Sequence, residues 1–251
     1  MGKLLHFEFH KLIRQKSFYI CLAVAVAMLF VSTYTTYLMQ KDAVDIGQMG
    51  IDGMHVMIGA VSGGTLSMVI GVFGPLFVCE DYVSGTIRNI VTRGYTRLGV
   101  FSAKLIAVLF ASAIMTIACM AAGYLVGTIF CVPGEQPFDA DTVKTLLCQL
   151  AVMLAEASLF YAISTVLQKT GGAIAICLVL PMVLTIVLAL ADTALADKEI
   201  QLSGYWLERI SGTLASFDVK SEDMKKALLT ALGYFTVTSI GSFAAVAKRE
   251  Y

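Results

Sequence analysis

The stretch EDYVSGTIRNIVTRGYTRLGVFSAK, residues 80–104, is a charged interruption between two long apolar segments. Its basic residues are Arg88, Arg93, Arg97 and Lys104. Gly85 predicts a break after the preceding helix, because glycine leaves helical backbone angles easily. Thr86 can then cap a short helix. The stretch therefore predicts a helix, a short helix and a further helix.

The short helix is expected to be amphipathic. Its apolar side chains recur at i, i+3 and i+4, as Ile87, Ile90 and Val91. The polar residues on the other face are Arg88, Asn89, Thr92 and Arg93. Gly94 suits the end of this helix, and Thr96 can cap the next one. We expect the short helix to lie parallel to a membrane; the alternative is a solvated loop kept inside by its positive charge.

The composition identifies an integral membrane protein. The chain is 58% hydrophobic and 14% charged, whereas soluble domains carry about a quarter charged residues. Its mean hydropathy is +0.80. The formal net charge is zero and no long basic tract occurs, so nothing indicates a nucleic-acid partner. We treat residues 1–251 as one transmembrane domain without a large soluble part.

Apolar segments of about 20 residues are long enough to cross a bilayer. The chain contains six, at residues 17–39, 56–79, 98–130, 142–167, 173–191 and 227–247. The fold class is thus an all-α integral membrane protein with six transmembrane helices. The first span is expected to be an uncleaved anchor, because STYTTYLMQ follows its apolar core in place of a small-residue cleavage site.

Glycine and proline mark special points in these spans. Gly59 and Gly63 form a GxxxG spacing in the second span, and Gly123 and Gly127 form another in the third; this spacing permits close helix packing. The second span carries Pro75 near its end, where it should kink the last turn. The fifth span carries Pro181 near its middle.

Residues 1–16 are expected to form a basic amphipathic helix in the membrane interface. Its apolar side comprises Leu5, Phe9, Leu12 and Ile13, and its opposite side comprises Lys3, His6, His10, Lys11 and Arg14. His6 and His10 are four residues apart and can share a metal, but no third ligand stands nearby. A solvated polar face is the alternative, and we expect no metal site.

The six cysteines are scattered without a CxxC pair, which favours small packing residues over a zinc site or disulfide framework. A single disulfide bridge between Cys131 and Cys148, which flank an external loop, remains the alternative. Residues 192–226 are too polar to span but contain an amphipathic patch with interface aromatics, at Tyr205, Trp206, Leu207, Ile210, Leu214 and Phe217. They predict a short external helix that dips toward the bilayer, or an ordinary surface helix.

The basic residues set the orientation. With the N-terminus inside, internal ends hold Lys3, Lys11, Arg14, Lys16, Arg88, Arg93, Arg97, Lys104, Lys169, Lys248 and Arg249. The short external loops hold only Lys41 and Lys144. The positive-inside rule therefore predicts a protein of the plasma membrane with both termini and residues 80–104 on the cytoplasmic side.

Glu80, Gly85-Thr86, Arg97 and Lys104 follow a pattern E-x(4)-G-T…R…K that resembles permease subunits of type-2 ABC exporters. The opening segment FEFHKLIRQKSFY is similar to that of short bacterial members, such as lantibiotic-immunity, bacitracin-resistance and peptide-toxin exporters. The resemblance implies that residues 80–97 are a coupling segment that docks on a separate ATPase subunit. The residues it assigns to coupling are Glu80, Tyr82, Gly85, Thr86, Ile87, Arg88, Asn89, Arg93, Arg97 and Lys104.

The same resemblance implies partners and a path. Two permease copies, or one copy and a paralogue, would enclose a path lined by the second and fifth spans with Pro75 and Pro181. ATP and magnesium would bind to the partner ATPase. This chain itself would bind no cofactor. The cargo would be an amphipathic peptide or peptide antibiotic, with drug or ion efflux as the alternative. Glu80 can pair with Arg97 or Lys104, and the turn at residues 168–172 is the alternative coupling element.

No P-loop occurs, and no HExxH, GxSxG or EExxxR pattern, so no catalytic residue is expected. Glu156 is the only carboxylate well inside a predicted span. It would either line the path and hold a cationic solute, or bond groups near Gln149 or a neighbouring Ser or Thr. Two other functions stay open. One is a membrane-embedded enzyme that uses Glu156 with a His or Asp, and the other is a carrier driven by an ion gradient, which would predict internal repeats with broken helices.

Overall fold

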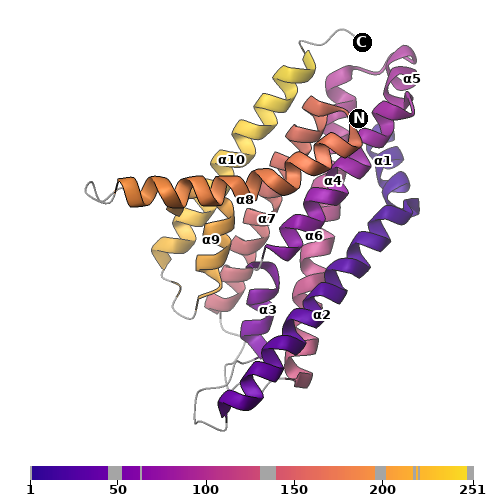
Figure 1. The fold of residues 1–251 in the computed structure, drawn as a ribbon. Coiled ribbons are helices and arrows are strands. Elements are labelled where there is room, and N and C mark those ends of the chain that lie inside the picture. Colours follow the sequence, from indigo (N-terminus) through magenta and orange to yellow (C-terminus); the bar gives the residue numbers. More distant parts are fainter. Residues whose placement is uncertain are drawn as a thin grey trace.

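The computed structural model describes residues 2–44, 53–62, 64–130, 140–195, 202–216, 219 and 221–247. All regular secondary structure in these ranges is helical (Figure 1). The helices are α1 (Gly2–Arg14), α2 (Lys16–Val44), α3 (Gly53–Ser62), α4 (Thr65–Val83), α5 (Thr86–Thr92), α6 (Arg97–Phe130), α7 (Ala140–Leu167), α8 (Thr170–Ala194), the 3-10 turn η2 (Ser203–Tyr205), α9 (Leu207–Leu214) and α10 (Ser221–Ala247).

Six helices of the described part are long and apolar enough to cross a membrane. Their membrane segments are Lys16–Leu38, Thr65–Val83, Arg97–Phe130, Asp141–Leu167, Thr170–Ala194 and Ser221–Val246. This confirms the prediction of an all-helical, multi-pass membrane protein with six spans. The polar segment before the last span holds one further helix, α9, of eight residues.

The second apolar segment is divided, whereas the sequence predicted one helix over residues 56–79. α3 ends at Ser62, and α4 begins at Thr65 after Gly64, whose φ of 70° lies in the left-handed region. Only glycine adopts this conformation without strain. The two pieces have different neighbours, because α3 packs mainly against α6, and α4 mainly against α7, α2 and α8.

Close helix packing occurs at the second glycine pair. A Cβ on Gly127 would lie 2.9 Å from the Cα of Gly53, and one on Gly123 would lie 3.0 Å from the Cβ of Ala60. The backbones of α3 and α6 therefore touch, as the GxxxG spacing predicts. At Gly59 a Cβ would meet nothing within 4 Å within this chain.

α8 differs from the other spans in its surroundings. Figure 1 shows it running across the bundle rather than along it, and only 11% of its membrane segment is buried. α7 is the central helix, because it contacts α4, α6, α8, α9 and α10. Cys131, one of the two cysteines of the possible Cys131–Cys148 bridge, lies outside the described residues, as do Lys248 and Arg249.

Candidate functional site

The short helix α5 lies where the sequence predicts it. Gly85 and Gly94 have φ of 69° and 88°, so both ends of α5 are left-handed turns. The Asn89 amide donates to the Gly85 carbonyl, which makes Gly85 the N-terminal cap, one residue before the predicted Thr86. The side chain of Ile87 is buried. The exposed residues of α5 and its end are Arg88, Asn89, Thr92 and Arg93.

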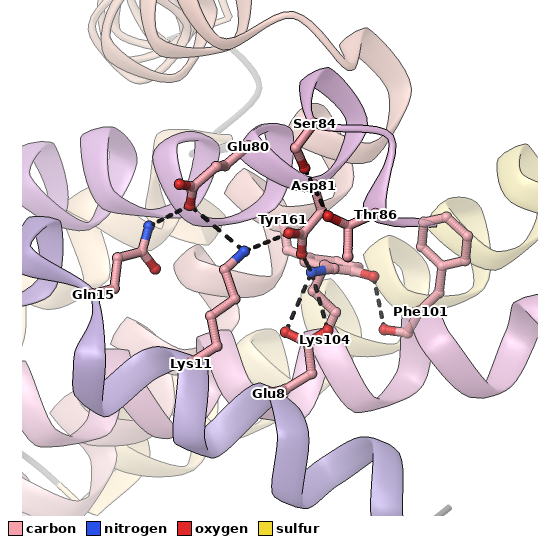
Figure 2. A network of polar contacts seen from close by, with 10 residues as sticks. All are labelled: Glu8, Lys11, Gln15, Glu80, Asp81, Ser84, Thr86, Phe101, Lys104 and Tyr161. Carbon is pink, nitrogen blue, oxygen red and sulfur yellow. Dashed lines mark hydrogen bonds and ion pairs between the residues drawn. The ribbon is translucent and has the colours of Figure 1, made fainter. Parts of the chain in front are cut away.

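A buried ion-pair network ties the ends of α1, α4 and α6 together, and comprises Glu8, Lys11, Glu80, Asp81 and Lys104 (Figure 2). The Lys104 ammonium is fully buried, pairs with Asp81 and lies 3.2 Å from Glu8 Oε1. Lys11 Nζ lies 2.5 Å from Asp81 Oδ1 and 3.5 Å from Glu80 Oε2. The network thereby joins α1, which is distant in sequence, to the two helices α4 and α6 that flank α5.

The network places opposite charges out of water. Burial raises the pKa of Glu8, while the Lys104 ammonium opposes that rise. The two lysines also face the ring of Phe77, with Nζ atoms 5.1 Å and 5.2 Å from its centroid. Removal of one partner from such a group leaves an uncompensated buried charge, which costs about 3–5 kcal/mol.

Lys104 pairs with Asp81 and Glu8, whereas the sequence hypothesis paired Glu80 with Arg97 or Lys104. The Glu80 side chain is 54% exposed and lies toward α1, where Gln15 Nε2 donates to Glu80 Oε2 at 2.8 Å. Successive helical residues point about 100° apart, so Asp81 faces inward when Glu80 faces α1. Sequence reasoning missed Glu8, Lys11 and Asp81 as members of this site.

The inward face of α1 is rotated relative to the predicted one. Leu4, Glu8 and Leu12 are buried at a spacing of four, whereas Ile13 is 62% exposed. Leu4 packs against Val100 on α6, and this contact places Glu8 opposite Lys104. The signal was available in the sequence, because Glu8 lies at i+4 from Leu4 and i−4 from Leu12.

A cavity of about 630 Å³ borders α5, and Asp81 of the ion-pair network also lines it. It gathers several residues assigned to coupling with the turn between α7 and α8, and its lining includes Tyr82, Gly85, Ile87, Arg88, Arg97, Gln168 and Lys169. Gln168 has φ of 57°. The predicted coupling segment and the alternative coupling element at residues 168–172 thus form one surface. Tyr82 packs its ring against Phe101, with centroids 6.2 Å apart.

The three residues suggested for a path lie on three different helices, α4, α7 and α8. Pro75 is buried in α4, and Pro181 is partly exposed in α8. Glu156 is buried on α7 and hydrogen-bonds to the Ser67 hydroxyl of α4, two turns away from Pro75 along that helix. Gln149 lies seven residues before Glu156 on α7, and its Nε2 donates to the Ile58 carbonyl at 3.0 Å.

Comparison with known proteins agrees with these features. The sequence model of the family described as ABC-2 family transporter protein matches residues 4–192, well over half of the chain. The match includes the ion-pair network, α5 and most of α8, and it ends before α9 and α10. No curated protein matches the chain with significance.

Proposed function

The chain belongs to the ABC-2 transporter family, and from this premise we propose that it is the membrane-spanning subunit of an ATP-driven exporter. Separate ATPase subunits would bind ATP and Mg²⁺ and supply the energy. This chain would be present in two copies, or beside a paralogue, in the plasma membrane with both termini in the cytoplasm. Family membership favours this function over a membrane-embedded enzyme or an ion-driven carrier.

The observation that carries the proposal is the arrangement of α5. It is a seven-residue helix between two spans, four polar residues on it and directly after it are exposed, and the ion-pair network joins the adjacent ends of α4 and α6. A force on α5 therefore reaches both spans at once. We propose that the ATPase docks on α5 and on the adjacent cavity with its basic residues Arg88, Arg97 and Lys169.

The proposed cargo is an amphipathic peptide or peptide antibiotic, and drug or ion efflux is the second candidate. The exposed apolar side of α8 is available to the cargo or to a second copy of the chain. Its exposed side chains are Val179, Met182, Val183, Ile186, Val187 and Leu190. Such a surface suits an amphipathic molecule better than a small hydrated ion.

The test uses the chain co-expressed with a candidate ATPase subunit. Arg88→Glu should leave the permease folded but weaken ATPase binding about tenfold or more, because charge reversal opposes the docking partner. Arg14→Glu, an exposed cation on α1, is the matched control. ATPase binding, cargo-stimulated ATP hydrolysis and export should fall together in Arg88→Glu alone. Normal values for all three in this variant would exclude α5 as the docking element.

A further inference from the structure

A second group of charges lies deep in the helical bundle, apart from the ion-pair network. Glu156 on α7 is 4% exposed. One side of its carboxylate receives the Ser67 hydroxyl, and Oε2 has no hydrogen-bond partner in the described part of the chain. A buried carboxylate oxygen without a partner is costly, and it indicates a missing group of opposite polarity.

Glu208 on α9 approaches from the other side. Both acids meet the first part of α4, because Glu156 is hydrogen-bonded to Ser67 and Glu208 lies against Gly64, three residues earlier. The hydroxyl of Thr185 on α8 donates to Glu208 Oε2 at 2.8 Å. Glu208 Oε1 lies over the helix break, 3.1 Å from where a Cβ on Gly64 would be. Four helices, α4, α7, α8 and α9, thus converge on two acids.

No positive side chain in the described ranges balances these acids. The ion pairs found there involve neither Glu156 nor Glu208. Arg209, next to Glu208 in sequence, is exposed, and its charge acts on Asp192. Like charges repel each other, and the repulsion is stronger where one of them, here Glu156, is buried. A cation from outside the chain would relieve this repulsion.

We propose that Glu156 and Glu208 form a binding site for a primary ammonium group. An ammonium donates three hydrogen bonds, and the site offers Glu156 Oε2 and both oxygens of Glu208 as acceptors. Calcium would require six to eight oxygens, more than these residues supply. Glu208 is half-buried and Thr185 is exposed, so the site opens beside the apolar side of α8. It would hold the charged end of an amphipathic amine whose apolar part lies on α8.

This inference deepens the proposed export function and rests on it for the nature of the cargo. Glu208 lies beyond the residues that the family model matches. The site would therefore give this chain its own selectivity rather than a property shared by the family. A lipid with an ethanolamine headgroup offers the same ammonium chemistry as a cargo amine.

The chain carries its own reporter for the test. Trp206 is the only tryptophan, and its indole Nε1 donates to Thr185 Oγ1 at 3.0 Å, next to Glu208. The purified full chain in phosphatidylcholine nanodiscs would be titrated with octylamine, and with octanol as the uncharged control. We expect a saturable change in tryptophan fluorescence with octylamine only. Glu156→Gln and Glu208→Gln should each raise the apparent Kd at least about tenfold.

The matched control is Glu222→Gln, an exposed glutamate on α10, which should bind octylamine as the wild type does. Equal responses to amine and alcohol, or wild-type affinity in both Glu156→Gln and Glu208→Gln, would overturn the proposal. Melting curves of the variants verify that each is folded. The titration needs neither ATPase nor transport, so its failure leaves the export function standing, and failure of ATPase docking leaves the binding result valid.

Nanodiscs that contain phosphatidylethanolamine separate the two sources of the ammonium group. If the headgroup occupies the site, octylamine will bind several-fold more weakly in these discs than in phosphatidylcholine. An unchanged Kd supports a site reserved for cargo. Both results require saturable binding of octylamine in phosphatidylcholine nanodiscs. If no such binding occurs, the proposed site is refuted.

Discussion

Removal of the Lys104 ammonium is the sharpest test of the ion-pair network. Lys104→Met keeps most of the length of the side chain and removes its charge, so Glu8 and Asp81 would both lose the fully buried cation that pairs with them. The expected loss of stability is about 3–5 kcal/mol. For a chain of this size it corresponds to a fall in Tm of about 6–20 °C, at about 2–4 °C per kcal/mol. The lower end is favoured, because burial already raises the pKa of Glu8 and lets it take a proton.

The assay can use the buried thiols of Cys21, Cys79, Cys119 and Cys177, which react with a thiol-specific dye only after unfolding. The double variant Lys104→Met/Asp81→Asn should recover part of the loss, because one of the two carboxylates beside the removed ammonium is then gone. Lys144→Met is the control, since Lys144 is an exposed lysine paired with Asp141. Its pair is expected to contribute less than about 1 kcal/mol. A Lys104→Met variant that melts within 2 °C of wild type, or a double variant no more stable than the single, would refute the reasoning.

Two further predictions concern Glu8 and the glycine contact between α3 and α6. Burial raises the pKa of Glu8 from 4.5, so the folded chain binds its proton more tightly than the unfolded chain. The contribution of Glu8 is then complete below pH 4.5 and is lost as the pH rises through the raised pKa. The difference in Tm between wild type and Glu8→Gln should accordingly be more favourable to wild type at pH 5 than at pH 7.5, and a pH-independent difference would contradict it. Gly127→Ala should destabilise the chain by about 1–3 kcal/mol, because a Cβ there would meet the α3 backbone at 2.9 Å. Gly59→Ala, where a Cβ meets nothing within 4 Å, should change the melting of the isolated chain little; equal losses would argue against close packing of α3 and α6.

The parts of the fold that depend on local sequence could be predicted. Six spans follow from apolar length, and the bounds of α5 follow from Gly85 and Gly94, because each needs a left-handed turn. The exposed position of Arg88 follows from the helical period. These features arise from neighbours within a few residues of one another.

The candidate site could be predicted only in part, because its partners are distant in sequence. Asp81 and Glu80 are adjacent carboxylates, and only the direction of α4 toward α6 decides which one meets Lys104. The break at Gly64 was hidden because glycine is also tolerated within membrane helices. Glu208 lies in a segment that reads as an external surface helix, so its approach to Glu156 depends on how α9 docks on α7.

The divided second span has a mechanical consequence. α3 is fixed to α6 where Gly53 meets Gly127, and α4 is fixed to α6 where Asp81 meets Lys104. These two points are about 35 Å apart along α6, given a rise of 1.5 Å per residue. The three helices are therefore the sides of a shallow triangle whose third corner is Gly64. A triangle whose three sides keep their lengths also keeps its angles, so a displacement of α5 that shifts the Asp81 corner moves Gly64 as well. Because Glu208 on α9 lies over Gly64, we expect a movement that begins at α5 to alter the spacing of Glu208 and Glu156.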